Sequence, residues 1–386
     1  MSTFRGYERP DGSVGIRNHV AVLPSVACAN GVVGMIASKV RGTVPLYHGH
    51  GCARAGRDLE LHFRTLSNLG KHPNVGATLV VGLGCEVIRA EHLASSIASS
   101  GKPVEYLDIQ SEGGSRITAE KGVARAIDLV ESVSRQKRKV SGIENLTVGL
   151  ECGGSDAFSG ITANPSVGIA ADWLVSEGGT VILTENTEMI GTSHILERRA
   201  CNPEVAGQVS SMISAAEERA RDILGPLASM VIAPGNMDGG MSSIQEKSLG
   251  CIAKGGTSII QQVVDYAERP ASSGLVLMDA PGYDTESMAG VAAAGAQVIL
   301  FTTGRGNPIG FPVVPVIKIA STTRLYRAMQ DDMDINAGAV LEGKSLTEIS
   351  EEILSVLAGV IDGEPARAEL NQQNGIVCLY VTNPSF

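Results

Sequence analysis

The feature that most constrains the fold is a recurring pattern of short apolar runs. Each run ends in a turn that contains glycine together with polar or thiol side chains. The clearest is ATLVVGL at 77–83, which is followed by Gly84, Cys85 and Glu86. Such a run suits a strand that is buried on both faces, as in the middle of a parallel sheet. Segments with helical periodicity lie between the runs. This alternation predicts an α/β fold with mainly parallel sheets flanked by helices.

The chain has 386 residues, which is more than one hydrophobic core usually serves. Segment 135–145 is charged at first and then contains Ser and Gly, a composition typical of a linker. We therefore predict an N-terminal α/β domain at 1–138 and a C-terminal α/β domain at 139–386. Within the second domain, the stretch PGNMDGGM at 234–241 is predicted to be a loop.

Composition and charge argue against several classes of protein. The net charge is −10 and aromatic residues make up only 4%, whereas nucleic-acid binding needs a basic surface. The one basic run, RQKRK at 135–139, is better explained as part of a solvated linker. We expect no export signal in segment 1–10 and no membrane span. The odd number of cysteines, 7, then favours reduced thiols in the cytoplasm.

Thiol, imidazole and carboxylate side chains follow several of the predicted strands. In an open parallel sheet, ligands bind at the carboxyl ends of the strands, so we expect these turns to gather at one rim. The mixture of side chains suits a divalent metal ion as well as acid–base chemistry. The residues are His48, His50, Cys52, Cys85, Glu86, Glu151, Cys152, Glu185 and Glu188.

Each cysteine also has a simpler interpretation, because a buried free cysteine commonly acts as a small apolar side chain. Cys52, Cys85 and Cys152 differ because each lies just past a predicted strand with glycine beside it. For these three, metal ligation and packing both stay open. No CxxC pair is present, which argues against a zinc ribbon. The cysteines assigned to packing are Cys201, Cys251 and Cys378.

Glycine-rich turns can also hold phosphate groups, but the chain has neither a GxxxxGKS/T pattern nor a clear GxGxxG after its first strand. The segment TGRGNP at 303–308 offers backbone donors and Arg305, which suit a carboxylate as well as a phosphate. A GxSxG nucleophile turn is absent too. These absences disfavour a nicotinamide-dependent dehydrogenase, which remains a rival interpretation.

Taken together, the turns resemble the altronate/galactarate dehydratase family, which also contains the large subunit of sulfolactate sulfo-lyase. The resemblance implies β-elimination from a hydroxy acid to give a 2-oxo acid, dependence on a divalent metal, typically iron, and no nicotinamide. It extends from residue 4 to about residue 338. The matching stretches are FRGYERPDGSVGIRN, HGHGCA, HPNVGATLVVGLGCE, ECGGSDAFSGITANPSVG, GGTVILTENTEMIG, KSLGCIAKGG, FTTGRGNP and DDMDINAG.

The sequence departs from the family pattern in two places. Dehydratases of this family usually carry a small domain ahead of the first motif, which begins here at Phe4. The resemblance therefore implies a separate small subunit, and we expect an oligomer. The stretch ARAGRDLELHFRTL after Cys52 differs from the galactarate enzymes. Altronate, galactarate and other hydroxy acids thus stay open as substrates, with release of sulfite from sulfolactate as the alternative reaction.

Elimination beside a carboxylate requires a base that faces Cα and an acid that protonates the leaving hydroxyl. The catalytic candidates are Glu86, Glu185, Glu188 and His48, with Glu86 or Glu185 as the base. The metal candidates are Cys52, Cys85 and Cys152, with His50 in reserve. The candidates for binding the substrate's carboxylate and hydroxyls are Arg17, Asn18, Ser155, Asp156, Ser159, Asn164, Arg305 and Asn307.

The metal could be bound in two ways. One is a mononuclear Fe²⁺, with Mn²⁺ as a further candidate, and the other is an iron–sulfur cluster, because three thiolates can hold a cluster with one open iron. A rival of another class is a sugar-acid-binding or regulatory subunit without catalytic activity. That rival predicts ligand binding without turnover.

Overall fold

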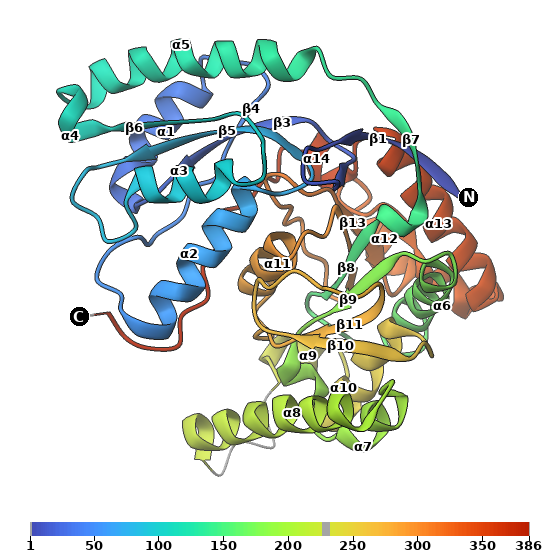
Figure 1. Cartoon of the computed structure of the whole chain (residues 1–386). Coiled ribbons are helices and arrows are strands. Elements are labelled where there is room, and N and C mark those ends of the chain that lie inside the picture. The colour runs from blue at the N-terminus through green and yellow to red at the C-terminus, as the bar shows by residue number, and fades with distance from the viewer. Residues whose placement is uncertain (1, 226–231, 386) are drawn as a thin grey trace.

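The computed structural model describes residues 2–225 and 232–385, and within them the chain forms two parallel sheets and one small antiparallel sheet (Figure 1). The N-terminal part comprises β3 (His19–Pro24), α1 (Asn30–Ala37), β4 (Thr43–Pro45), α2 (Gly56–Gly70), β5 (Val75–Gly82), α3 (Ala90–Ala98), β6 (Val104–Asp108), α4 (Ile109–Glu112) and α5 (Ser115–Ser134). Its four parallel strands have the order β4-β3-β5-β6. Val20 and Val22 pack with α1 and α5, whereas Leu23 packs with α2 and α3, so helices cover both faces.

The second sheet has seven parallel strands in the order β10-β11-β9-β8-β12-β13-β14 among the described residues. It is formed by β8 (Thr147–Cys152), β9 (Thr180–Leu183), β10 (Ile260–Val264), β11 (Gly274–Met278), β12 (Val298–Thr303), β13 (Val316–Ala320) and β14 (Ile335–Asn336). The helices of this part are α6 (Ala163–Ser176), α7 (Ser193–Leu196), α8 (Pro203–Leu224), α9 (Pro234–Asp238), α10 (Ile244–Ile252), α11 (Asp284–Ala293), α12 (Thr323–Ala328), α13 (Leu346–Asp362) and α14 (Arg367–Leu370). One face of the sheet packs against α6 and α13, and the other packs against α11.

Two local predictions differ from the structure. Part of the predicted linker 135–145 is the strand β7 (Lys139–Gly142), which pairs antiparallel with β1 (Thr3–Glu8), and β1 also pairs with β2 (Val14–Gly15). Exposed polar residues suit an edge strand as well as a linker, so composition alone could not separate the two. The predicted loop 234–241 begins with α9, because proline is compatible with the first turn of a helix.

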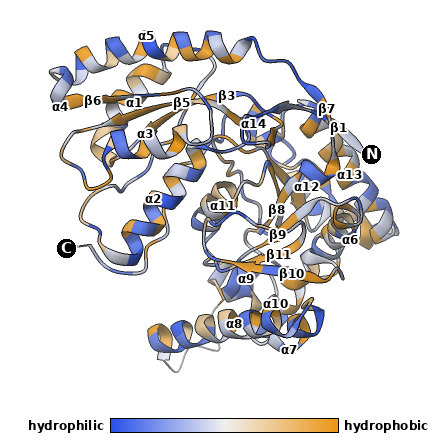
Figure 2. Ribbon diagram, in the orientation of Figure 1, coloured by the Kyte–Doolittle hydropathy of each residue, from blue (hydrophilic) through white to orange (hydrophobic). Residues whose placement is uncertain are grey.

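The predicted fold class, α/β with mainly parallel sheets flanked by helices, is confirmed. Figure 2 shows hydrophobic strands and helices whose outer faces are hydrophilic. One hydrophobic cluster includes Leu66 of α2, Ile182 of β9 and Phe301 of β12, so the two parallel sheets share part of their core. No helix in the described ranges combines the length and apolar character needed to cross a membrane.

The junction between the two sheets depends on buried side chains in the turn between α2 and β5. The Asn74 side-chain oxygen accepts a hydrogen bond from the Ile16 amide at 2.9 Å, and its NH₂ group donates to the carbonyls of Gln297 and Val313, both at 2.9 Å. The ring of His72 also hydrogen-bonds to the Ala296 carbonyl at 2.9 Å. Asn74 therefore satisfies backbone groups from three separate segments.

We predict that Asn74→Ala lowers the free energy of unfolding by about 3 kcal/mol, because it leaves buried backbone groups without partners. Urea denaturation measures this loss. Asn145→Ala is the control, because that side chain is exposed and its loss should matter little. Equal effects of the two substitutions would contradict this account of the junction.

Candidate functional site

Four metal-competent side chains meet at the carboxyl edge of the seven-stranded sheet. Cys152 ends β8, and Cys251 lies on α10. After β9, Glu185 directly precedes the turn η3 (Asn186–Met189), and Glu188 lies within that turn. One ligand atom from each lies within 4.8 Å of the others, and all four residues are buried. We call this group the Cys–Glu cluster. In the described part of the chain, it is the one group of this kind.

Two lysines neutralise the carboxylates of the Cys–Glu cluster. Lys254 lies just after α10, is fully buried, and places its Nζ 2.7 Å from Glu185 Oε2. Lys247 of α10 forms an ion pair with Glu188. Buried charges cost several kcal/mol each unless they are paired, so these two pairs make the buried site possible.

Cys152 links the two glutamates. Its backbone N–H donates to Glu185 at 3.0 Å, and its thiol donates to Glu188 at 2.7 Å. A hydrogen bond with Cys251, together with burial, raises the pKa of the Cys152 thiol well above its usual value. Cys152 therefore carries a proton near neutral pH in the metal-free protein.

The two glutamates have different proton affinities. Burial and the neighbouring Glu188 carboxylate raise the pKa of Glu185 to about 7, although Lys254 acts in the opposite direction. Burial also acts to raise the pKa of Glu188, but Lys247 and Lys254 outweigh it, and that pKa is lowered. Glu185 can thus gain or lose a proton near neutral pH, whereas Glu188 stays charged.

Glu185 has a strained backbone. Its φ of 70° lies in the left-handed region, which costs a non-glycine residue about 1–2 kcal/mol. In this conformation its carboxylate contacts both Lys254 and the Cys152 amide. Strain of this kind is commonly kept at functional sites, where neighbouring contacts hold it.

Two further titratable side chains, Glu151 and Lys318, lie in the sheet one residue before the level of Cys152. Glu151, Phe301 and Lys318 are paired neighbours on β8, β12 and β13. Burial and the Glu185 carboxylate raise the pKa of Glu151 well above its usual value. Burial lowers the pKa of Lys318 to about 7, and its ammonium group lies 3.6 Å from the centre of the Phe301 ring. Glu151 therefore favours its protonated form, and Lys318 is about half protonated near pH 7.

A cavity of about 250 Å³ adjoins the Cys–Glu cluster. Ser155 and Lys247 line it, and both also contact the cluster: Ser155 Oγ is 3.4 Å from Cys152 Sγ, and Lys247 pairs with Glu188. We call it the Ser155 cavity. Its other polar lining includes Asp156, Ser159 and Asn164.

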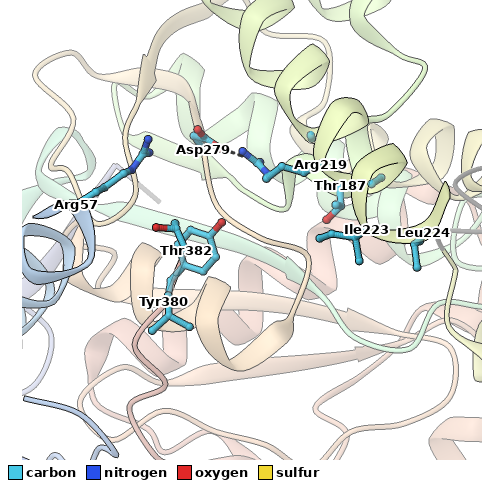
Figure 3. A pocket seen from close by; sticks show the side chains of 11 residues that line it. Arg57, Thr187, Arg219, Ile223, Leu224, Asp279, Tyr380 and Thr382 are labelled. Atoms are coloured by element: carbon cyan, nitrogen blue, oxygen red, sulfur yellow. Dashed lines mark ion pairs between the residues drawn. The ribbon is translucent and has the colours of Figure 1, made fainter. Parts of the chain in front are cut away.

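A second cavity, of about 560 Å³, lies between α2, α8 and the C-terminal segment (Figure 3). Arg57, Arg219 and Thr187 are among its lining residues, and Thr187 belongs to the same η3 turn as Glu188. In Figure 3, Arg219 points toward Asp279, with 3.8 Å between their charged groups. We call this the Arg219 cavity.

The structure brings together part of the predicted site. Glu185, Glu188 and Cys152 meet in the Cys–Glu cluster, and the predicted substrate-binding residues Ser155, Asp156, Ser159 and Asn164 all line the Ser155 cavity. The Asp156 carboxylate accepts hydrogen bonds from both the amide and the hydroxyl of Ser159 at 2.8 Å, so these two residues also shape their own turn. One oxygen of Asn164 is buried without a hydrogen-bond partner in the described residues.

The other predicted metal and catalytic residues follow strands of the four-stranded sheet and are not part of the Cys–Glu cluster. Cys52 and Cys85 have exposed thiols, and His50 is half-buried beside His62. Both ring nitrogens of His48 are used: Nε2 donates to the Pro24 carbonyl at 2.7 Å, and Nδ1 accepts from the His50 amide. Burial lowers the pKa of His48 to about 4, so it stays neutral.

Glu86 also lies at the edge of the four-stranded sheet. It accepts hydrogen bonds from the Ser25 hydroxyl at 2.7 Å and the Gly84 amide at 2.6 Å. Burial acts to raise the pKa of Glu86, but these hydrogen bonds outweigh it and lower the pKa. A carboxylate held this way is a weak base.

The remaining predicted substrate ligands have other partners. Arg17 forms an ion pair with Glu369 at 2.8 Å, and Asn18 donates to the Val133 carbonyl at 3.0 Å, so both join distant segments. Asn307 donates to Asp284 at 2.9 Å. Arg305 is exposed and lies beside Gly154, next to the Ser155 turn.

Sequence reasoning missed three residues of the site: Lys247, Cys251 and Lys254. Their spacing was the available signal, because positions i, i+4 and i+7 lie on one face of a helix. The stretch KSLGCIAKGG was recognised for its family resemblance, but Cys251 was assigned to packing. A buried thiol flanked by two lysines on one helical face indicates a charged site instead.

Two family models together match most of the chain. The family model described as D-galactarate/Altronate dehydratase, C-terminal, matches residues 143–383. The model for the second domain of D-galactarate dehydratase/Altronate hydrolase matches residues 6–134. The chain belongs to the altronate/galactarate dehydratase family. The resemblance predicted from the motifs is thereby confirmed.

Similar proteins have been named in several bacteria. The altronate dehydratase of Bacillus subtilis is 37% identical over 381 residues, covering 96% of this chain and 76% of the relative. The (2R)-sulfolactate sulfo-lyase subunit beta of Chromohalobacter salexigens is 36% identical, and the match covers 95% of this chain and 94% of the relative. The galactarate dehydratase (L-threo-forming) of Escherichia coli is 35% identical, and the match covers 94% of this chain and 73% of the relative. These relatives confirm the prediction of an enzyme of the lyase class.

We predict that Lys254→Met destabilises the protein in a pH-dependent way. Glu185 has a folded pKa of about 7 and an ordinary unfolded value of about 4.3, so the ion pair exists only above about pH 7. The variant should lose about 3 kcal/mol at about pH 8, where Glu185 is left charged without a partner. The loss should shrink at about pH 5.5, where Glu185 is protonated.

Urea denaturation of the metal-free protein at both pH values measures this effect. The double variant Lys254→Met/Glu185→Gln is the control, because it removes both charges and should recover most of the stability at high pH. Equal losses for the single variant at both pH values would show that the ion pair does not hold the site together.

Proposed function

We propose that the protein is a dehydratase that removes water from a sugar acid or related hydroxy acid, such as altronate or galactarate, to give a 2-oxo acid. The names of the relatives support this proposal. The observation that carries it is the buried Glu185 carboxylate, held by Lys254 and the Cys152 amide in a cluster that adjoins a polar cavity. A carboxylate with these partners is suited to remove a proton beside a substrate carboxylate.

Glu185 is proposed as the base. Its position is set by two hydrogen bonds to one oxygen, and a further side-chain hydrogen bond joins Glu185 to Glu151, whose pKa is raised. The Glu185 carboxylate is the group that would accept the proton from Cα. The double bond then forms as the hydroxyl at the next carbon leaves, and the resulting enol rearranges to the 2-oxo acid.

The leaving hydroxyl requires a proton and the substrate carboxylate requires a cation. Ser155 is proposed to donate the proton, because its hydroxyl lines the cavity. Lys247 lines the same cavity, and Arg305 lies beside it next to Gly154. Both are proposed to stabilise the negative charge that grows on the substrate carboxylate.

The same proposal includes dependence on a divalent metal ion. The Cys–Glu cluster can hold such an ion only if its thiols lose their protons. The two lysines already balance the two glutamates, so a dication needs the two thiols to ionise. Cys152, Cys251 and Glu188 would then hold the ion, leaving Glu185 as the base. Thiolate ligands favour iron over magnesium. The ion would act as a Lewis acid that stabilises the enediolate.

A second candidate reaction is release of sulfite from sulfolactate. It is supported by one relative, the (2R)-sulfolactate sulfo-lyase subunit beta, which is 36% identical over 372 residues. The same relative supports the proposal of a separate small subunit. A base at Glu185 serves both eliminations, because both begin with loss of the proton at Cα.

We predict that the wild-type protein, purified anaerobically with and without a candidate small subunit, forms a 2-oxo acid from altronate or galactarate. Glu185→Gln should lower kcat/KM by about a thousandfold, because the amide cannot accept the proton. Product is measured by a 2-oxo acid assay, with sulfite detection when sulfolactate is the substrate.

Glu286→Gln is the matched control, because Glu286 is a half-buried carboxylate on α11 that has no part in the proposed chemistry. It should keep the wild-type rate. Substrate binding without turnover by the wild-type protein would support the binding-subunit rival, and full activity of Glu185→Gln would remove Glu185 as the base.

A further inference from the structure

The Arg219 cavity has no part in the proposed reaction, and its walls come from three separate parts of the chain. Arg57 lies in the first turn of α2, Arg219 lies on α8, and Tyr380 belongs to the C-terminal segment. The volume of about 560 Å³ falls within the range of sites that bind small organic molecules, about 300–1,000 Å³. The cavity is therefore large enough to hold such a ligand.

The C-terminal segment forms a fixed wall of this cavity. The Asp58 carboxylate, next to Arg57 on α2, accepts hydrogen bonds from the Thr382 amide at 2.8 Å, the Thr382 hydroxyl at 2.6 Å and the Asn383 amide at 3.0 Å. Leu379, directly before Tyr380, is buried in the core that the two parallel sheets share. These contacts hold the segment against α2, so the cavity is a built feature of the fold.

The guanidinium groups of Arg57 and Arg219 have distant ion-pair partners. A nitrogen of Arg57 lies 3.6 Å from the Asp265 carboxylate, and a nitrogen of Arg219 lies 3.8 Å from the Asp279 carboxylate. Both distances exceed the usual range of an N–H···O hydrogen bond, about 2.7–3.2 Å. A guanidinium group carries five N–H donors, so both arginines keep donors for a ligand that enters the cavity.

The ion pairs beside the cavity leave a surplus of one positive charge. Arg64 also approaches Asp265, at 3.4 Å, so Arg57, Arg64 and Arg219 share the two carboxylates of Asp265 and Asp279. The whole chain has a net charge of −10, so this local surplus runs against the overall charge. An anion with a single charge balances the surplus, whereas a phosphate ester with two charges exceeds it.

Another side of the cavity is apolar. Ile223 and Leu224, at the end of α8, line it and expose 79% and 38% of their surface. Figure 3 shows these two side chains on one side and Arg57 and Tyr380 on the other, with Arg219 between them. Exposed apolar side chains are stabilised when an apolar ligand removes their surface from water. The cavity thus combines a cationic part with an apolar part.

We propose that the Arg219 cavity binds an organic carboxylate that has a single negative charge and an apolar body. The carboxylate accepts hydrogen bonds from Arg57 and Arg219, and the apolar body packs on Ile223 and Leu224. A sugar acid is a poor ligand here, because its hydroxyl groups would lose water at the apolar side without gaining partners. This site does not rest on the proposed dehydratase function or on metal binding.

The test is calorimetric titration of the full chain with octanoate, which has one charge and an apolar body. The wild-type protein should bind one octanoate per chain, and it should bind uncharged 1-octanol at least about tenfold more weakly. Arg57→Gln and Arg219→Gln should each weaken octanoate binding by about tenfold, because each removes a charge-assisted hydrogen bond. The two side chains are 58% and 45% exposed, so both variants should stay folded.

Arg221→Gln is the matched control, because Arg221 is an exposed arginine two residues further along α8 that does not line the cavity. It should keep the wild-type affinity for octanoate. Excess galactarate should not displace octanoate, which separates this site from the Ser155 cavity. The proposal is overturned by a lack of saturable octanoate binding, by equal affinity for 1-octanol, by displacement with galactarate, or by wild-type affinity in both Arg57→Gln and Arg219→Gln.

Discussion

The buried ion pair between Lys254 and Glu185 is the interaction on which the site depends. Neither side chain is exposed, and an unpaired charge at this position would cost several kcal/mol. The pair exists because α10 and the turn after it lie against the turn that follows β9. Glu185 is in turn anchored to the end of β8 through the Cys152 amide. One pair thus joins two strand ends to a helix that lies about seventy residues further along the chain.

Charge balance explains why the two thiol-rich regions suit different chemistry. In the Cys–Glu cluster, two lysines offset two glutamates, and the Cys152 thiol has a raised pKa, so acid–base chemistry is available without a metal. At the edge of the four-stranded sheet the thiols are exposed, and the nearby histidine and glutamate are held by hydrogen bonds. The Cys–Glu cluster is therefore suited to move protons, whereas Glu86 and His48 at that edge are already engaged in hydrogen bonds.

Sequence patterns were sufficient for the architecture because buried parallel strands leave continuous apolar runs: segment 77–83 corresponds to β5. They also identified Cys152, Glu185 and Glu188, since side chains after parallel strands meet at one edge. They could not assign strands to sheets. Cys85 and Cys152 follow equally good strands, but two sheets have two separate edges. Lys254 went unnoticed because lysine is usually exposed, and only its spacing from Cys251 reveals the shared helical face.

The central claim is that elimination takes place where the Ser155 cavity adjoins the Cys–Glu cluster, with Glu185 as the base. The most direct measurement is a crystal structure of the protein with an inert hydroxy acid that lacks the leaving hydroxyl. The account predicts this ligand in the Ser155 cavity, with its Cα facing the Glu185 carboxylate and its carboxylate near Lys247. A ligand bound in the Arg219 cavity or at the edge of the four-stranded sheet, with Glu185 still buried and out of contact, would contradict it.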